Sequence, residues 1–573
     1  MRVISIACTL AAVLAAAGCK RSTQDARPSA GSGSGGGSAA PGSGKTADAL
    51  GALSFPLTEG TPAARAHFNR GLLALHSFWY DEALRQFAAA SAADPSMNMA
   101  HWGQAMSHVK LLWGEDDVMA AKMALASMPD PDKLSPYEQG WIAATVELLK
   151  APDVRSSRLA FAHALEKLTT EYPADDEVAT FYALTLLSTI RPENPDNLAI
   201  REKAAALAAK VFARNPHHPG AAHYLIHADD TPALASKALD AARAYRTIAP
   251  AAFHAQHMPA HIFVRLGMWS DAIASCQKAW DSSVASMQRN KLSANHVDIH
   301  SLQWLVEMPF EIGQRRSADD AMAKFALAIR TGLSHRYRSF YASEVASYLT
   351  RTSEWTRVDE LLAPLDAAPA EDGPDVGATS ACDGGTNPAG EVGGKIAVLE
   401  TRARAAAMQH DVDRTKKLIA ELDAAHAQLA PTLKTSQPAA TVAALDAQSA
   451  RLKRELLARA ANDRTALIAV LRELTDAAHV DTGGESNPTA FLAEEELADA
   501  LLDAKEPAKA SEAYAHVLAD QPGRAHSLLG AARAAAAQND AAGSARSYAA
   551  LVTLWKDAEP TTPGLDESRA AKR

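Results

Sequence analysis

Hydrophobic positions along most of this chain recur at the three-to-four-residue spacing of amphipathic helices. Beyond the first 55 residues almost no stretch alternates in the two-residue rhythm of a strand. Small and large residues also recur at fixed offsets of a 34-residue unit, and in the first unit these are Gly71, Ala83, Phe87, Ala90 and Pro95. Small residues let two helices approach closely, and a proline after the second helix prevents its continuation. The pattern predicts stacked helix–turn–helix pairs.

The same frame returns further along the chain. The residues that fit it are Ala238, Pro250, Ala272, Ala498, Ala510, Tyr514, Pro522 and Tyr548. Residues 98–213 are expected to form less regular helical pairs. We therefore predict an all-α helical solenoid, an elongated body in which each repeat contacts only its neighbours.

Composition divides the chain into segments. Gly-, Ser-, Ala- and Pro-rich stretches cannot bury apolar surface, so they indicate tethers or loops. The expected segments are a signal peptide (1–18), a tether (19–55), an N-terminal solenoid (56–366), a linker or loop (367–392), a C-terminal helical block (393–560) and a tail (561–573). The tail is expected to fray.

The N-terminus has the organisation of a targeting segment. Arg2 precedes an apolar run, residues 3–17, that is too short for a mature membrane span and ends in Ala-Ala-Gly-Cys19. This ending resembles a bacterial lipobox, which implies that Cys19 becomes the lipidated first residue; the alternative is an ordinary secretory signal with a chance cysteine. Lys20, rather than Asp, suggests the outer membrane of a Gram-negative bacterium. We expect an extracytoplasmic, lipid-anchored protein.

Charge and cysteine content exclude some classes of protein. The 573-residue chain has a formal net charge of -10 and a pI near 6.1. It carries no basic run with interleaved aromatic residues, so nucleic acid is not an expected partner. The four cysteines, Cys8, Cys19, Cys276 and Cys382, form no paired framework, and disulfides are not expected to stabilise the fold.

Three longer motifs carry a family resemblance. HPGAAHYLIHADD (218–230), HAQHMPAHIFVRLGMWSDAI (254–273) and LGAARAAAAQNDAAGSARSYAALVTLW (529–555) resemble segments of a group of bacterial tetratricopeptide repeat lipoproteins of largely unassigned function. The resemblance extends over most of the mature chain. It implies a tetratricopeptide solenoid whose concave face binds a protein or peptide partner, and it implies no reaction.

Histidines cluster in one part of the chain. Nine of the 20 lie between residues 217 and 300. His223 and His227 are four residues apart, as are His257 and His261, and the two pairs are offset by 34 residues. A four-residue step places both imidazoles on one helix face, and the 34-residue step repeats that face on the next unit. In tetratricopeptide proteins these positions, and that of His254, line the concave groove.

The next predicted helix, about 293–312, extends this patch. His296 and His300 are again four residues apart, and the same face continues to Gln303 and Glu307. The candidate ligand-binding residues are His223, His227, His254, His257, His261, His296, His300, Gln303 and Glu307. The candidate metal ligands are His223, His227, His257, His261, His296 and His300. Pro259 must delay or kink the helix that contains it.

Three interpretations of the patch remain open. The imidazoles can be structural, each bonded to a carboxylate or free carbonyl. They can bind a metal, with zinc or copper as the candidate ions. They can also form a groove for a peptide chain end, a carboxylate or a glycan. His76 and His335 stand alone and are expected to be solvated or locally bonded.

Enzymatic motifs are not found. The steps HYLIH, HMPAH and HVDIH lack the glutamate of the H-E-x-x-H zinc protease motif, and no G-x-S-x-G occurs. The sequence therefore favours a membrane-tethered binding or scaffold protein over an enzyme. The alternative is a metal-binding or metal-dependent protein with its site in the groove.

Overall fold

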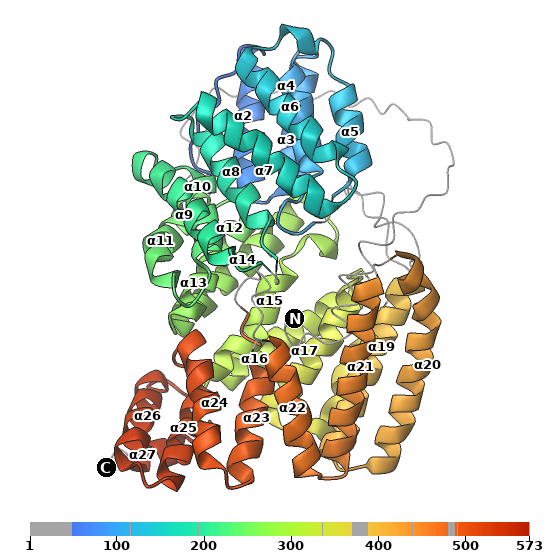
Figure 1. The fold of residues 1–573 in the computed structure, drawn as a ribbon, viewed down its shortest axis with the longest axis vertical. Coiled ribbons are helices and arrows are strands. Elements are labelled where there is room, and N and C mark those ends of the chain that lie inside the picture. Colours follow the sequence, from blue (N-terminus) through green and yellow to red (C-terminus); the bar gives the residue numbers. More distant parts are fainter. Residues whose placement is uncertain are drawn as a thin grey trace.

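The protein is built of helices packed in sequence order (Figure 1). The computed structural model describes residues 49–114, 116–191, 194–334, 336–368, 388–436, 439–478, 487–489 and 491–571. Within these ranges no residue lies in a β-strand. Helices that follow one another along the chain pack side by side, as α2 does on α3 and α3 on α4. The prediction of an all-α helical solenoid is confirmed for the described residues.

The first seven helices described form the upper part of Figure 1. They are α2 (Pro62–His76), α3 (Tyr80–Ala93), α4 (Asn98–Ser107), α5 (Val118–Ala126), α6 (Pro136–Lys150), α7 (Val154–Glu171) and α8 (Asp176–Ser188). Helix α9 (Asn197–Arg214) follows, below them in this view.

The middle of the molecule contains helices of uneven length, from five to 22 residues. They are α10 (Pro219–Asp229), α11 (Leu239–Ile248), α12 (Phe253–His257), α13 (Pro259–Arg265), α14 (Trp269–Asn290), α15 (Ile299–Glu307), α16 (Arg315–Arg330), α17 (Arg336–Thr352) and α18 (Val358–Asp366). Short 3-10 turns, among them η5 (Met308–Ile312), join some of them.

The C-terminal helices form the lower part of Figure 1. They are α19 (Pro388–Met408), α20 (Val412–Ser436), α21 (Ala439–Ala460), α22 (Arg464–Ala478), α23 (Leu492–Asp503), α24 (Pro507–Asp520), α25 (Ala525–Ala537), α26 (Ala541–Leu554) and α27 (Leu565–Ala571).

Small residues allow the helices of a repeat to approach closely. A Cβ atom on Gly71 would lie 2.9 Å from the ring of Phe87, and one on Gly103 would lie 2.2 Å from it. Phe87 is completely buried between these helices. In the C-terminal block, a Cβ on Gly530 would lie 2.1 Å from Tyr514. Because a side chain larger than hydrogen does not fit, glycine at these positions sets the distance between helices.

The segment boundaries differ from those predicted at three places. Leu50 and Phe55, expected in the tether, are buried in the core. The predicted linker lies largely outside the described residues, but α19 begins five residues before the expected start of the C-terminal block. It packs on α17, where the Thr401 hydroxyl donates to the Ala342 carbonyl (2.9 Å). The tail is not frayed throughout, because α27 buries Leu565 against α25 and α26.

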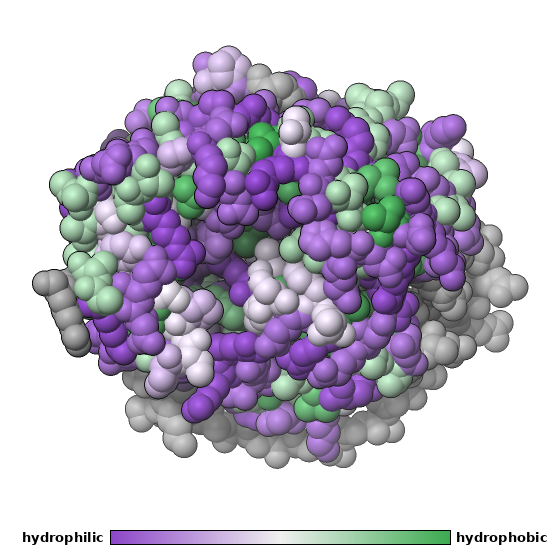
Figure 2. Space-filling model, turned by 90° about the horizontal axis from the view of Figure 1, so that it is seen from below, coloured by the Kyte–Doolittle hydropathy of each residue, from purple (hydrophilic) through white to green (hydrophobic). Residues whose placement is uncertain are grey.

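The expectation of neighbour-only contacts is wrong. Arg265 at the end of α13 pairs with Asp520 of α24 (2.6 Å). The indole nitrogen of Trp555 donates to the Glu311 carbonyl (3.1 Å), and the amide of Ala525 donates to the Glu311 carboxylate (2.7 Å). The C-terminal repeats therefore curl back against the middle of the solenoid. Seen from below, largely hydrophilic side chains surround a central hollow (Figure 2).

None of the described helices combines the length and the apolar composition needed to cross a bilayer. Cys19 and the signal segment lie outside the described residues.

Candidate functional site

Six histidines of the patch gather into two groups of three. The first triad is His223, His227 and His254, and the second triad is His257, His261 and His300. Within each triad one nitrogen atom from every ring lies within 4.8 Å of the others. Five of the six predicted metal ligands, together with His254, therefore converge.

Four short helices in the middle of Figure 1 supply these rings. Helix α10 carries His223 and His227, and α15 carries His300. Helix α12 ends at His257, and α13 starts at Pro259, the first helical position, where its missing N–H is not needed. The proline thus divides the predicted helix in two, with His254 and His257 before the break and His261 after it.

The first triad is organised around His223. Its Nε2 atom lies 2.9 Å from Nε2 of His227 and 3.1 Å from Nε2 of His254. Its Nδ1 atom lies 2.7 Å from the carbonyl oxygen of His76. A carbonyl can only accept, so Nδ1 carries the proton and, with the ring neutral, Nε2 presents a bare lone pair. The Nε2 atoms of His227 and His254 thus both lie within hydrogen-bond distance of the one lone pair on Nε2 of His223.

His261 has the same role in the second triad. Its Nδ1 atom lies 3.1 Å from Asp230, whose carboxylate also accepts from Arg265 (2.9 Å). The guanidinium favours the ionised carboxylate, so Nδ1 of His261 donates and its Nε2 is bare. Nε2 of His257 lies 3.0 Å from that bare nitrogen.

Two side chains lie beside the other nitrogen of His257. Its Nδ1 atom is 2.9 Å from the hydroxyl oxygen of Ser301 and 3.4 Å from the Sγ atom of Cys276. The Ser301 hydroxyl donates to Asp298 (2.5 Å), whose pKa is raised by burial. When Nδ1 of His257 donates to Ser301, its Nε2 is unprotonated and faces the unprotonated Nε2 of His261. A cation between these two nitrogens would convert their repulsion into coordination.

Burial keeps most of these rings neutral. Desolvation, and after it the neighbouring imidazoles, hold the pKa of His223, His254 and His257 well below its usual value. The pKa of His227 falls to about 3, chiefly through burial. Neutral imidazole is the form that binds metal.

The site is more enclosed than the predicted groove. His223, His227, His257 and His261 are buried, whereas His254 is half-buried and His300 is exposed. Any opening to solvent is therefore on the side of the two least-buried rings. The expectation that all these histidines line an open concave groove is wrong.

Three predicted ligand-binding residues lie outside both triads. Nε2 of His296 is 3.7 Å from Asp81, and the amide of Gln303 donates to Glu344 (3.5 Å). Glu307 contacts Arg351 (3.5 Å). Gln303 and Glu307 are one and two turns beyond His300, and two turns advance about 11 Å along a helix axis. His300, Gln303 and Glu307 therefore lie along one face of α15, as predicted, but this face leads away from the other histidines.

A third group, His76, Glu177 and His218, was not predicted. Glu177 accepts from Nε2 of His76 (2.7 Å) and from Nε2 of His218 (3.1 Å). Nδ1 of His76 accepts from the Tyr224 hydroxyl (2.9 Å), and Nδ1 of His218 accepts from the Ala221 amide (3.2 Å). Every nitrogen of this buried group has a compatible partner. His76 is thus neither solvated nor solitary; no local spacing signals a contact across 101 residues.

The electrostatics of Glu177 agree with this structural role. Burial alone would raise the pKa of its carboxyl group, but the opposite effect of His76 and His218 is larger and lowers this pKa to about 2. The carboxylate is therefore ionised and accepts from both rings. Since the carbonyl of His76 also accepts from His223, this group holds the first triad in place.

Aromatic rings pack against both triads. Phe78 lies against the ring of His223 (centroids 4.4 Å apart), and Trp304 lies against that of His261 (4.7 Å). Phe78 has a positive φ of 53°, a left-handed conformation that is unfavourable for a bulky residue. Trp113, 44% exposed, meets the edge of His254 (6.0 Å). These rings give the site apolar walls.

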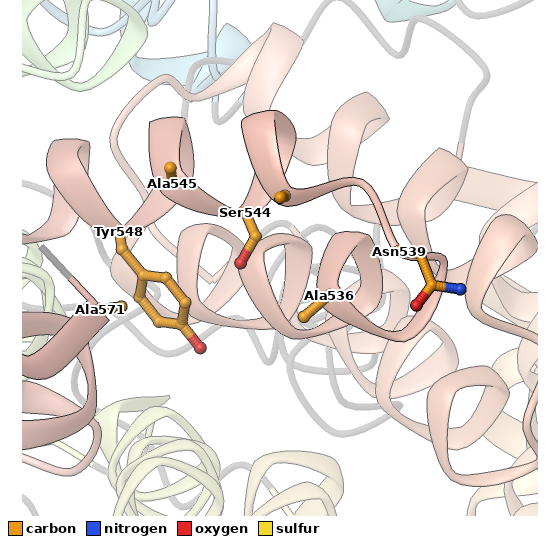
Figure 3. Close-up of a pocket in the computed structure, with 7 residues that line it drawn as sticks. Ala536, Asn539, Ser544, Ala545, Tyr548 and Ala571 are labelled. Atoms are coloured by element: carbon orange, nitrogen blue, oxygen red, sulfur yellow. The ribbon is translucent and has the colours of Figure 1, made fainter.

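A separate pocket lies among the last helices (Figure 3). It has a volume of about 420 Å³ and is lined mainly by alanines, with Asn539, Ser544 and Tyr548 as polar neighbours. The Tyr548 hydroxyl already donates to Glu567 (2.5 Å). The lining contains no group that ligates metals well, so this pocket adds nothing to the histidine site.

Comparisons with known proteins assign no function to the chain. No protein-family profile and no curated protein matches the chain. Among solved structures, yeast Tom70 is 12% identical (89% of this chain, 95% of that chain, TM-score 0.30). The tetratricopeptide domain of P58(IPK) is 13% identical (70% and 100%, TM-score 0.19), and a monomeric mutant of IFIT1 with Gppp-AAAA is 11% identical (86% and 99%, TM-score 0.30).

Proposed function

We propose that this protein binds a transition metal, zinc or copper, through its histidine triads. The observation that carries the proposal is the convergence of the ring nitrogens of each triad within 4.8 Å, with Nε2 of His257 and Nε2 of His261 3.0 Å apart. Tetrahedral coordination at 2.0–2.1 Å places ligand nitrogens about 3.3 Å apart, close to this separation. Imidazole is a preferred ligand for both ions.

The carboxylate and carbonyl behind the rings support the same function. Metal-bound histidines commonly donate their second N–H to a carboxylate or a backbone carbonyl, which fixes the ring and its tautomer. Asp230 has this position behind His261, and the carbonyl of His76 has it behind His223. In the Glu177 group, by contrast, every ring nitrogen has a compatible hydrogen-bond partner.

Partner binding and location complete the proposal. Helical solenoids present extended surfaces that bind proteins and peptides, so a protein partner on the remaining surface is compatible with a metal in the triads. We propose no catalytic activity.

Lipidation of Cys19 would hold the protein outside the cytoplasm, at the outer membrane, where metal ions exchange readily. Replacing Cys19 with Ser should move the protein from the membrane fraction to the soluble fraction; unchanged retention would exclude Cys19 as the anchor.

Metal content tests the function directly. The full-length chain, purified in detergent, is stripped with a chelator, reloaded with Zn²⁺ or Cu²⁺ and dialysed. We expect stoichiometric metal in the parent and none above background in the double variant His223→Ala/His257→Ala, with helical circular dichroism retained. The control is His516→Ala, an exposed histidine of α24. Equal metal content in the parent and the double variant would overturn the proposal.

A further inference from the structure

The two triads are built by one repeated construction. Each triad contains two histidines four residues apart, His223 and His227 in the first and His257 and His261 in the second. The third histidine comes from a helix further along the chain, His254 from α12 and His300 from α15. His254 completes the first triad and His257 begins the second, and both lie on the five-residue helix α12. The two triads therefore lie beside each other, because His254 and His257 are only three residues apart on one helix.

Distances between rings show how near the triads are. The ring centroids of His254 and His257, which belong to different triads, are 6.3 Å apart. Within the triads the widest pairs are as far apart, at 6.4 Å for His227 and His254 and 6.2 Å for His261 and His300. The separation between the triads at His254 and His257 is therefore about the same as the widest separation within a triad.

The ligand set is uncharged. All six ligands are imidazoles, and the nearest carboxylates are behind the rings: Asp230 accepts from His261, and Asp298 accepts from Ser301. Asp230 is further neutralised by Arg265. Two divalent ions held by six neutral ligands in an enclosed site retain their positive charge, which favours a negative ligand between them. Divalent metals generate hydroxide from bound water near neutral pH.

We propose that the triads hold two metal ions side by side, joined by one small bridging anion that is hydroxide in the resting state. The inference rests on the proposed metal binding. The half-buried His254 and the exposed His300 place any access for the bridging ligand where the two triads are least buried. The geometry is therefore that of a dinuclear centre rather than of two independent sites.

Copper provides the test because coupling between two Cu²⁺ ions through a bridge cancels their paramagnetism. The full-length chain in detergent is loaded with Cu²⁺ and dialysed, and its copper content is compared with the integrated electron paramagnetic resonance signal. We expect two copper ions per chain and a signal well below two spins. Azide, added as a probe for the bridging position, should produce a new charge-transfer absorption.

Two matched variants each remove one triad. His254→Ala leaves the second triad and His300→Ala leaves the first, and both replace the least-buried rings, so folding is least disturbed. Each should bind one copper ion and show one full spin. His516→Ala should behave as the parent does.

The outcomes separate the two proposals. No copper above background in the parent would overturn metal binding itself. Two copper ions with two full spins would leave metal binding intact and overturn the bridge. One copper ion per chain, lost in both variants, would show that the six histidines form a single mononuclear site and would overturn the pairing.

Discussion

At the residue scale, the second nitrogen of each imidazole decides its role. Nδ1 of His223 and of His261 is committed to donate, which leaves Nε2 bare and directed at other imidazoles. In His76 and His218 the same atoms alternate between donor and acceptor with compatible partners. Chemically identical side chains therefore form a ligand set in one place and a closed hydrogen-bond network in another.

Asp230 should tune metal affinity through His261. In Asp230→Asn the charge that stabilises the donating Nδ1 is lost, and metal affinity should fall about 10- to 100-fold. The control is Asp229→Asn, a buried neighbour with one carboxylate oxygen that has no hydrogen-bond partner and with a pKa raised by burial to about 6. Competition with a chelator measures both. Equal losses in the two variants would indicate a general charge effect instead of an effect on His261.

The metal-free protein should lose stability as pH falls below about 6.5. Unfolded histidines bind protons near pH 6.5, whereas His227 in the folded state has a pKa of about 3. Below pH 6.5 the unfolded state therefore binds more protons, so stability falls with pH by about 1.4 kcal/mol per unit for each such site. Above pH 6.5 this contribution does not change.

Denaturant unfolding of the chelated protein at pH 7.5 to 5 measures this effect. His227→Gln removes one titrating group from the site and should flatten the curve. A parent stability that stays level or rises between pH 6.5 and 5 would show that these rings are not held neutral by burial.

At the element scale, short helices form the histidine site, and glycines set the distances between helices elsewhere in the molecule. Division of the predicted helix at Pro259 allows α12 to serve both triads before α13 begins. Glycines opposite large aromatic residues set how closely helices pack, as Gly103 does opposite Phe87. Both features are local in sequence, but each matters through a contact with another helix.

Gly530→Ala should destabilise the C-terminal block. The new methyl group would lie 2.1 Å from the ring of Tyr514, which is completely buried and donates to Asp499. Overpacking of this kind costs about 1–3 kcal/mol. Gly394→Ala in α19 is the matched control, since its nearest neighbour would be 3.8 Å away and alanine favours helix by roughly 0.5–1 kcal/mol. Thermal unfolding that is equal in the two variants would contradict this account of the packing.

At the scale of the whole molecule, buried charges join distant parts of the chain. Arg524 is fully buried and pairs with both carboxylate oxygens of Glu495 (3.0 and 2.6 Å). Glu311, from the middle of the chain, lies 3.8 Å from the same guanidinium. Asp230 connects the second triad to this contact region, because Arg265 bonds both Asp230 and Asp520.

Arg524→Met should weaken the closure of the C-terminal repeats onto the middle. Without this guanidinium, the buried Glu495 keeps only the Ser527 hydroxyl (2.7 Å) and the more distant Arg351 (4.0 Å) as partners. Breaking a buried ion pair of this kind costs about 3–5 kcal/mol. Arg454→Met is the control, because its ion pair with Glu473 is exposed and should leave the unfolding midpoint almost unchanged. Small-angle scattering should show expansion only in the first variant. An unchanged radius of gyration together with unchanged stability would contradict the closure.

Local pattern alone determined the helices, the 34-residue frame and the two histidine pairs, because helical periodicity and i,i+4 spacing are properties of neighbouring residues. Tertiary structure decided which histidines meet. His300 completes a triad while His296 pairs with Asp81, although both were predicted on one face. It also brought Glu177 to His76 and Asp520 to Arg265. Contacts across such separations depend on how the repeats curve and on where burial forces polar groups to find partners, and neither leaves a local spacing in the sequence.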